Sequence, residues 1–300
     1  MLLPPQIAVV QHAGHRALQL TTRHGEAVIA MQGAHLLSWV PTDQRDVFWL
    51  SRASLPEPAA IRGGVPICWP WFAKQGQGSS AVQHGPVRNL HWRVSAIHAC
   101  NDDEVSLTLE PVNMCPVQLT EAGIPVGLLV SLRVTLGQTL RQTLHTDNQS
   151  NSQFVLSQAL HSYYAVSHAQ RVGIDGIQGL SYIDRLRDLA PGVQQSPFSL
   201  GQACDRTYEH GLEVPASNSH RYTLLDAEWQ RRIVIEVEGS RSVVVWNPGH
   251  ETARNMVDVA NDDWPDFICI EAANAGPDVI GLMPGESHTL SQHLKSELAC

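Results

Sequence analysis

Residues 61–72 and 83–88 bring together side-chain types that suit a carbohydrate site. The first segment, IRGGVPICWPWF, contains Arg62, a pair of glycines and two tryptophans, and the second, QHGPVR, contains His84 and Arg88. Glycines let the backbone approach a ligand closely, indole faces lie against the C–H surface of a pyranose, and guanidinium groups bind hydroxyls or phosphate. The combination predicts a sugar site with an anion cradle, although a single arginine in a loop is commonly only a surface residue.

His161 has the chemistry of a proton-transfer group. It lies in VLSQALHSYY, where strand alternation puts it on one face with Ser157, Ala159 and Tyr163. An imidazole has an ordinary pKa of about 6.5, so on a polar strand face it can exchange a proton near neutral pH. The residue taken alone leaves a second interpretation open, a structural histidine that only makes hydrogen bonds.

Two carboxylates could act on a sugar. Glu271 closes the apolar run FICIE, on the face shared by Phe267 and Cys269. If it is buried, its pKa rises and it becomes a useful acid or base, whereas at a solvated strand end it is only a surface charge. Asp205, in ACDRTY, could hold a sugar hydroxyl or form an ion pair with Arg206.

The elements that must position these groups are β-strands. Apolar residues alternate over 105–109 and over 130–136, and glycine and proline interrupt the chain at short intervals. Helical periodicity is hard to find. The pattern predicts an all-β protein, a large antiparallel β-sandwich that forms a single domain over residues 1–300.

Two hairpins are predicted within this sandwich. Residues 128–136 would turn back through 137–138, and residues 233–238 would turn back through 239–240 into 243–246. Both turns contain the glycine that a tight connection favours.

Two further segments remain ambiguous. Residues 175–193 fit either a short helix around 182–189 or a loop excursion. Trp246, at the end of the strand VVVWNPG, could be a core residue or a platform for a sugar ring.

Composition and charge narrow the functional class. The 300 residues carry a net charge of −9, with no run of Lys or Arg, which predicts no nucleic-acid partner. The N-terminus lacks a basic region and two prolines interrupt its apolar run, so we expect no secretion signal and no membrane anchor. Six cysteines without a C-x-x-C pair predict reduced thiols in a cytoplasmic protein.

Motifs for other chemistries are missing from the sequence. It contains no H-E-x-x-H, no tight Cys/His cluster, no G-x-S-x-G and no phosphate-binding glycine loop of the nucleotide type. We therefore expect no metal, no cofactor and no covalent nucleophile. A monomer is the default expectation for the oligomeric state.

Six motifs in a fixed order resemble one known family. They are IRGGVPICWPWF, QHGPVR, ALHSYY, CDRTY, VVVWNPG and FICIEAAN. Together they are similar to the glucose-6-phosphate 1-epimerases, or hexose-6-phosphate mutarotases, of the aldose 1-epimerase-like family, from about residue 30 to the C-terminus. The resemblance implies the galactose-mutarotase type of β-sandwich and a sugar phosphate as the substrate.

The resemblance also implies roles for individual residues. His161 would be the general acid at the ring oxygen and Glu271 the general base at the anomeric hydroxyl. The substrate-binding residues that it implies are His84 at the ring oxygen or a neighbouring hydroxyl, Asp205 at sugar hydroxyls, and Arg62 and Arg88 as phosphate and substrate clamps. Trp246 is a further substrate-binding candidate, as a platform for the sugar ring.

Two positions depart from the family pattern, and other functions stay open. Ala73 stands where glycine commonly follows WPWF, and Pro86 stands where an aromatic residue is usual, so the shape of the site is not fixed by the resemblance.

A mutarotase for unphosphorylated aldoses would use the same acid and base. A non-catalytic carbohydrate-binding protein would keep the tryptophans and arginines, and a glycosidase would need Asp205 and Glu271 to flank a glycosidic bond.

Overall fold

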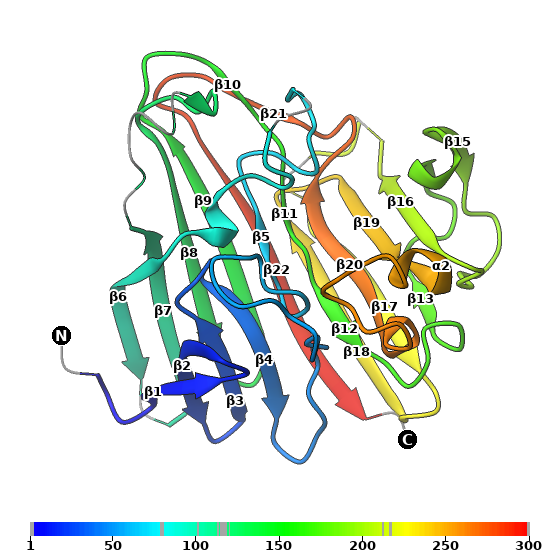
Figure 1. Cartoon of the computed structure of the whole chain (residues 1–300), viewed down its shortest axis with the longest axis horizontal. Coiled ribbons are helices and arrows are strands. Elements are labelled where there is room, and N and C mark those ends of the chain that lie inside the picture. Colours follow the sequence, from blue (N-terminus) through cyan, green and yellow to red (C-terminus); the bar gives the residue numbers. More distant parts are fainter. Residues whose placement is uncertain are drawn as a thin grey trace.

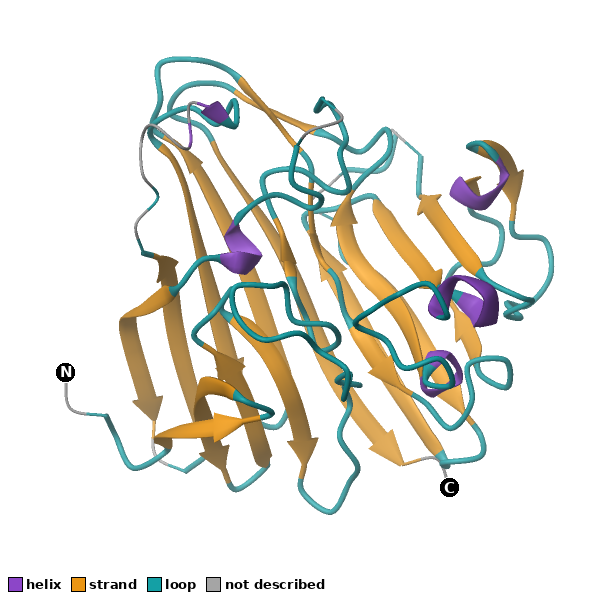
Figure 2. Ribbon diagram, in the orientation of Figure 1, coloured by secondary structure: helices purple, strands orange, loops and turns teal. Residues whose placement is uncertain are grey.

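Two large antiparallel sheets form most of the protein (Figures 1 and 2). The computed structural model describes residues 3–78, 81–100, 102–112, 114, 119, 121–211, 213–215 and 218–298.

The first large sheet, sheet I, has the strand order β13-β17-β18-β22-β9-β8-β7-β6. In that order its strands are Gly173–Asp175, His220–Asp226, Arg231–Glu238, Ser287–Leu298, Leu140–Asn148, Leu128–Leu136, Glu104–Pro111 and Trp92–Cys100.

The second large sheet, sheet II, has the order β15-β14-β16-β19-β20-β11-β5, and β12 also pairs with β20. In that order the strands are Ala190–Val193, Ser181–Asp184, Cys204–Glu209, Ser242–Asn247, Phe267–Asn274, Gln158–Leu160 and Ile67–Cys68, with β12 at Tyr163–Ala165.

Smaller elements complete the described part of the fold. A four-stranded sheet of β1 (Ile7–His12), β2 (His15–Thr22), β3 (Gly25–Ala30) and β4 (His35–Pro41) contacts β7 and β8, and β10 (Phe154–Leu156) pairs with β21 (Ile280–Leu282). Helical segments are short: α2 (Gly249–Ala253) and the 3₁₀ turns η1 (Val87–Asn89), η2 (Arg185–Arg187) and η3 (Trp264–Asp266). Figure 2 shows how little of the ribbon is helical.

The core lies between the two large sheets. Val105, Leu107 and Leu109 of β7 are fully buried, as the alternation predicts, and they share one hydrophobic cluster with Ile268 and Ile270 of β20. Burying a side chain of this size stabilises the fold by about 1.5–3 kcal/mol relative to leaving it exposed. The predicted all-β sandwich is confirmed, and the single domain stays a prediction.

One predicted hairpin forms and the other does not. Strands β8 and β9 pair around the turn, with Leu136 opposite Leu140, as predicted. The hairpin predicted for residues 233–246 is wrong, because β18 pairs with β17 and β22 in sheet I, whereas β19 pairs with β16 and β20 in sheet II. The chain crosses between the sheets at residues 239–241. Alternation is the same for both topologies, so it could not distinguish them.

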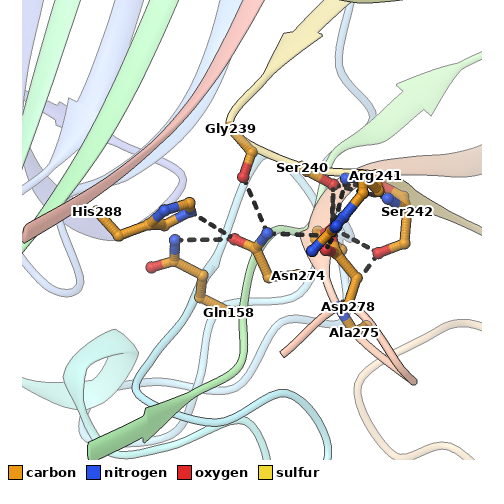
Figure 3. A network of polar contacts seen from close by, with 10 residues as sticks. Gln158, Gly239, Ser240, Arg241, Ser242, Asn274, Ala275, Asp278 and His288 are labelled. Carbon is orange, nitrogen blue, oxygen red and sulfur yellow. Dashed lines mark hydrogen bonds and ion pairs between the residues drawn. The ribbon is translucent and has the colours of Figure 1, made fainter. Parts of the chain in front are cut away.

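A buried polar network holds this crossing (Figure 3). The Asp278 carboxylate accepts a hydrogen bond from the backbone N–H of Arg241 at 2.8 Å and from the side-chain amide of Asn274 at 3.1 Å. Gly239 has a φ of +83°, and a Cβ there would lie 1.9 Å from the carbonyl oxygen of Thr289. Only glycine fits this close approach, so the position fixes where the chain leaves sheet I.

Residues 181–193 form an excursion at one edge of sheet II. The helix considered around 182–189 is only the 3₁₀ turn η2, which begins after Asp184, and β14 and β15 flank it as paired strands. The Asp184 carboxylate caps the turn by accepting a hydrogen bond from the Leu186 N–H at 3.0 Å. Asp188 then ends the turn in the left-handed region, with a φ of +52°.

Two predictions from composition can be compared with the described residues. Cys68, Cys204 and Cys269 are buried free thiols, as predicted. Cys115 and Cys300 lie outside the described residues, as does the side chain of Cys100. No helix in the described ranges has the length and hydropathy needed to span a membrane.

Candidate active site

Sheet II brings His161 and Glu271 into contact. Strands β11 and β12 both pair with β20, and their registers put the intervening His161 opposite Glu271. The His161 Nε2 and Glu271 Oε1 atoms are 3.3 Å apart. The sequence placed Glu271 at the end of a strand, which is wrong, since β20 continues to Asn274 and Glu271 is only 1% exposed.

The two faces of β20 explain how a carboxylate reaches this position. Ile268 and Ile270 point into the main core, whereas Phe267 and Cys269 belong to a separate apolar cluster on the other face. Glu271 projects from that other face, as the alternation predicts. A strand that is apolar from Phe267 to Ile270 therefore carries one buried carboxylate, on the face turned away from the main core.

Burial moves the two groups in opposite directions. It raises the pKa of Glu271 well above the ordinary 4.5, and the like charge of Asp205 adds to the effect. Burial lowers the pKa of His161 well below 6.5, and Arg62 and Arg88 act in the same direction. Both Glu271 carboxylate oxygens and His161 Nδ1 are buried without a hydrogen-bond partner among the described residues. Such atoms are expected where a ligand supplies the missing bonds.

Aromatic rings fix the imidazole of His161. The Tyr163 ring stacks on it, with centroids 4.9 Å apart and 12° between the planes. His84 and Trp246 meet it edge-on, at 5.6 and 5.9 Å. Trp246 is only partly buried, so its indole borders the site rather than filling the core.

His84 lies on a strained turn that pairs it with Ala73. The two residues have φ values of +64° and +51°, in the left-handed region that residues with a Cβ rarely adopt. The His84 N–H donates to the Ala73 carbonyl at 2.6 Å, and the Ala73 N–H donates to His84 Nδ1 at 3.1 Å. Because Nδ1 accepts, a neutral His84 ring carries its proton on Nε2 and can donate it to an oxygen atom.

Arg62 and Arg88 differ in how their charge is compensated. Arg62 donates to the Asp258 carboxylate from Nε at 2.9 Å and from Nη2 at 2.8 Å, and from Nη1 to the Tyr163 hydroxyl at 2.7 Å. The Arg88 side chain makes no hydrogen bond or ion pair within the described ranges, its Nε is buried, and burial lowers its pKa. A partly buried guanidinium without a carboxylate suits an anionic ligand.

Asp205 lies near Arg185 and does not pair with Arg206, the partner considered from the sequence. Neighbouring strand residues project from opposite faces, so an Asp205–Arg206 pair does not form. Arg206 pairs with Asp184 at 3.1 Å, and Asp205 Oδ1 lies 3.7 Å from Nη1 of Arg185. The guanidinium of Arg185 also covers the ring of Phe72, 5.0 Å from its centroid.

Sequence reasoning missed Arg185 and Asp258. Arg185 lies in the charged stretch DRLRD of the excursion, and Asp258 lies between two valines after α2. Neither position has a spacing that marks a site. Their contacts depend on chain segments far away in the sequence.

The strand order of sheet II arranges these groups in a row. Asp205 is on β16, Glu271 is two strands further along on β20, and His161 follows on the segment between β11 and β12. Arg62 donates to the hydroxyl of Tyr163, two residues beyond His161, and the charges of Arg62 and Arg88 both act on His161, whereas that of Asp205 acts on Glu271. The order is therefore Asp205, Glu271, His161 and then the pair of arginines.

Comparison with known proteins identifies the family. The family model described as aldose 1-epimerase matches residues 16–295 of the chain. The chain belongs to the aldose 1-epimerase family. Its similarity to two bacterial members is high over most of its length. An Escherichia coli (strain K12) protein named "Putative glucose-6-phosphate 1-epimerase" is 32% identical over 83% of this chain and 80% of its own. A protein of the same name from Salmonella typhimurium is 34% identical over the same shares.

Solved structures of other proteins share the fold of this aldose 1-epimerase family member. The crystal structure described as a "putative mutarotase" from Salmonella typhimurium has a TM-score of 0.86 at 29% identity, covering 99% of this chain and 95% of that one. A galactose mutarotase-like protein from Clostridium acetobutylicum has a TM-score of 0.69 at 15% identity, covering 97% and 98%. The predicted galactose-mutarotase type of sandwich is confirmed.

The candidate site gathers the residues predicted from the sequence. His161 touches Glu271, and His84 and Trp246 border His161. Asp205 and the two arginines lie at opposite ends of the row described above. The roles of the individual residues stay predictions.

Proposed function

We propose that the protein interconverts the α and β anomers of a hexose 6-phosphate, with glucose 6-phosphate as the leading candidate. The single observation that carries the proposal is the buried contact between Glu271 and His161 in a member of the aldose 1-epimerase family. The names of the bacterial relatives support a phosphorylated hexose over a free one.

The reaction needs one acid and one base. Glu271, as the carboxylate, removes the proton of the C1 hydroxyl, and His161, as the imidazolium, protonates the ring oxygen, so the C1–O5 bond breaks and an open aldehyde forms. Rotation about C1–C2 presents the other carbonyl face. Ring closure then reverses both proton transfers and gives the opposite anomer. Each transfer is typically worth about 10²–10⁴-fold in rate.

The pKa shifts favour the ring-opening step. It converts the carboxylate and imidazolium into a carboxylic acid and a neutral imidazole, which are the forms that burial stabilises at both residues. Because ring closure reverses both transfers, the pair returns to its starting state without exchange with bulk water. The distance of 3.3 Å between His161 Nε2 and Glu271 Oε1 puts the two groups close enough to act on neighbouring atoms of one sugar.

The row of groups across sheet II matches the order of atoms in a hexose 6-phosphate. The hemiacetal carbon C1 carries O1 and is joined to the ring oxygen, which is bonded to C5, and C5 carries C6 with its phosphate. With O1 at Glu271 and the ring oxygen at His161, the phosphate would extend away from Glu271, on the side of Arg62 and Arg88. Because Asp258 already compensates Arg62, we infer that Arg88 supplies most of the attraction for the phosphate.

Exchange NMR of the sugar anomers tests the acid–base proposal. We expect the wild-type protein to accelerate anomer exchange of glucose 6-phosphate, and Glu271→Gln to lower that rate by about 10²-fold or more. Glu251→Gln, at a side chain that is 92% exposed on α2, should act like wild type. Near-normal rates for Glu271→Gln, at an unchanged midpoint of thermal unfolding, would reject the role of this carboxylate.

The same assay tests whether the protein recognises the phosphate group of the substrate. We expect kcat/KM to be higher for glucose 6-phosphate than for glucose, and Arg88→Gln to reduce that preference. Arg93→Gln, at an exposed arginine paired with Glu110, is the matched control. Equal kcat/KM for the two sugars would point to an epimerase for unphosphorylated aldoses. Binding without acceleration would point to a non-catalytic sugar-binding protein.

A further inference from the structure

Arg185 presents unused hydrogen-bond donors beside the acid–base pair. Its side chain is 25% exposed, and in the described part of the chain it contacts Asp205, in an ion pair at 3.7 Å, and the ring of Phe72, on which it stacks. No hydrogen bond within that part uses its guanidinium N–H groups. Phe72 in turn meets the His84 ring edge-on at 5.0 Å, so Arg185 is packed against the aromatic residues of the site.

The excursion of sheet II holds Arg185 in this position. The Asp184 carboxylate caps the turn at Leu186 N and also accepts a hydrogen bond from Arg206 at 3.1 Å. The side chain of Asp184 is buried, and β14 is paired on both sides, with β15 and β16. A guanidinium on a rigid turn can recognise a ligand at little entropic cost.

The reaction geometry indicates which sugar atom lies near Arg185. If O1 is at Glu271 and the ring oxygen at His161, the carbon neighbour of C1 is C2, which lies on the side of C1 away from the ring oxygen and so points along the row away from His161. The next groups in that direction are Asp205 on β16 and its partner Arg185. The C2 hydroxyl would then meet a carboxylate acceptor and a guanidinium donor at the same point.

We propose that Arg185 is a specificity-determining residue that donates a hydrogen bond to the C2 hydroxyl and, with Asp205, selects the equatorial configuration at C2. An equatorial hydroxyl projects outward along the plane of the ring and so along the row of groups, whereas an axial hydroxyl projects out of that plane. Holding O2 also fixes C2 while C1 rotates in the open-chain form. This inference rests on the function proposed above and adds the basis of its sugar preference.

The inference is tested with three substrates and with variants of Arg185 and Arg187. Exchange NMR would give kcat/KM for glucose 6-phosphate, for mannose 6-phosphate, which has an axial C2 hydroxyl, and for 2-deoxyglucose 6-phosphate, which has none. Each value is corrected for the uncatalysed rate of that sugar. The variants are Arg185→Gln, Arg185→Lys and the control Arg187→Gln, which changes an exposed arginine of the same 3₁₀ turn.

We expect the wild type to favour glucose 6-phosphate over both other sugars. Arg185→Gln should lower kcat/KM for glucose 6-phosphate by roughly tenfold, the usual effect of one hydrogen bond to a charged group, with a much smaller loss for the 2-deoxy sugar. For Arg185→Lys, kcat/KM for glucose 6-phosphate should lie between the values for the wild type and for Arg185→Gln, since lysine keeps the charge but lacks the planar guanidinium group. Arg187→Gln should keep the wild-type ratios.

Two results would overturn the inference while leaving the proposed function intact. One is a wild type that accelerates glucose 6-phosphate and the 2-deoxy sugar equally. The other is an Arg185→Gln variant that lowers kcat/KM for all three sugars by the same factor, because that pattern indicates a structural role. A wild type that accelerates none of the three rejects the proposed function itself, and the inference with it.

Discussion

The opposite pKa shifts of Glu271 and His161 determine how the site should respond to pH. Burial raises the pKa of Glu271 well above the ordinary 4.5 and lowers that of His161 well below the ordinary 6.5. Both shifts stabilise the one-proton state in which the carboxyl group is protonated and the imidazole is neutral. The carboxyl group therefore keeps its proton to a higher pH than an ordinary glutamic acid, and the imidazole takes up a proton only at a lower pH than an ordinary histidine.

We predict that the profile of kcat/KM against pH does not have its two limbs at 4.5 and 6.5, the values of an unperturbed carboxyl group and imidazole. The alkaline limb should follow the loss of the Glu271 proton, well above 4.5, and the acid limb the protonation of His161, well below 6.5. The measurement is kcat/KM for glucose 6-phosphate against pH, corrected for the spontaneous reaction at each pH. Limbs at 4.5 and 6.5 would indicate two groups with ordinary pKa values and no effect of burial.

The residues of the site could be predicted from the sequence only in part. His161 and Glu271 stand in motifs whose fixed order has a family resemblance, but their contact depends on a strand register that no local pattern encodes. The burial of Glu271 could not be predicted either, because the run FICIE gives no sign that β20 continues past it. Arg185 left no usable signal, since a single arginine in a charged turn is ordinary surface composition.

At the scale of elements, the turn that links Ala73 and His84 sets the orientation of one site histidine. The two residues exchange backbone and side-chain hydrogen bonds, and both have positive φ. The family resemblance puts glycine where this chain has Ala73, and the φ of +51° gives the physical reason for that preference.

We predict that Ala73→Val lowers kcat/KM between about 10- and 100-fold, because a β-branched residue in the left-handed region would move the turn and His84 with it. Ala73→Gly adopts the same backbone without strain and should keep near-normal activity. Both variants would be compared by exchange NMR after circular dichroism has established that they fold. Equal activity of the valine and glycine variants would mean that the turn does not control His84.

The positions of the strands were easier to predict from the sequence than the pairing between strands. Alternation over β7 and β8 gives these two strands correctly, and the short glycine turn at residues 137–138 gives the hairpin of β8 and β9. The same logic fails at residues 233–246, where the buried corner around Gly239 sends the next strand into the other sheet. Long-range contacts with β20 and β22 determine which sheet the strand after Gly239 joins.

At the scale of the whole molecule, the sandwich depends on how the chain passes from sheet I to sheet II. The network around Asp278 joins the crossing at Arg241 to Asn274 of β20, and through Asn274 to His288 of β22 at 3.1 Å (Figure 3). Asn274 also accepts a hydrogen bond from Gln158 of β11 at 3.1 Å. Strand β20, which carries Glu271, and strand β11, which precedes His161, are thus tied to both sheets by buried polar groups.

We predict that Asp278→Ala lowers the free energy of unfolding by about 3 kcal/mol, because it leaves the backbone N–H of Arg241 and an amide N–H of Asn274 without their shared acceptor. Urea unfolding followed by tryptophan fluorescence measures the change. Glu228→Ala, which breaks an exposed ion pair with Arg171, is the control and should change stability little. If the two variants unfolded at the same urea concentration, the crossing would owe its stability to apolar packing, and the network would matter only for the path of the chain.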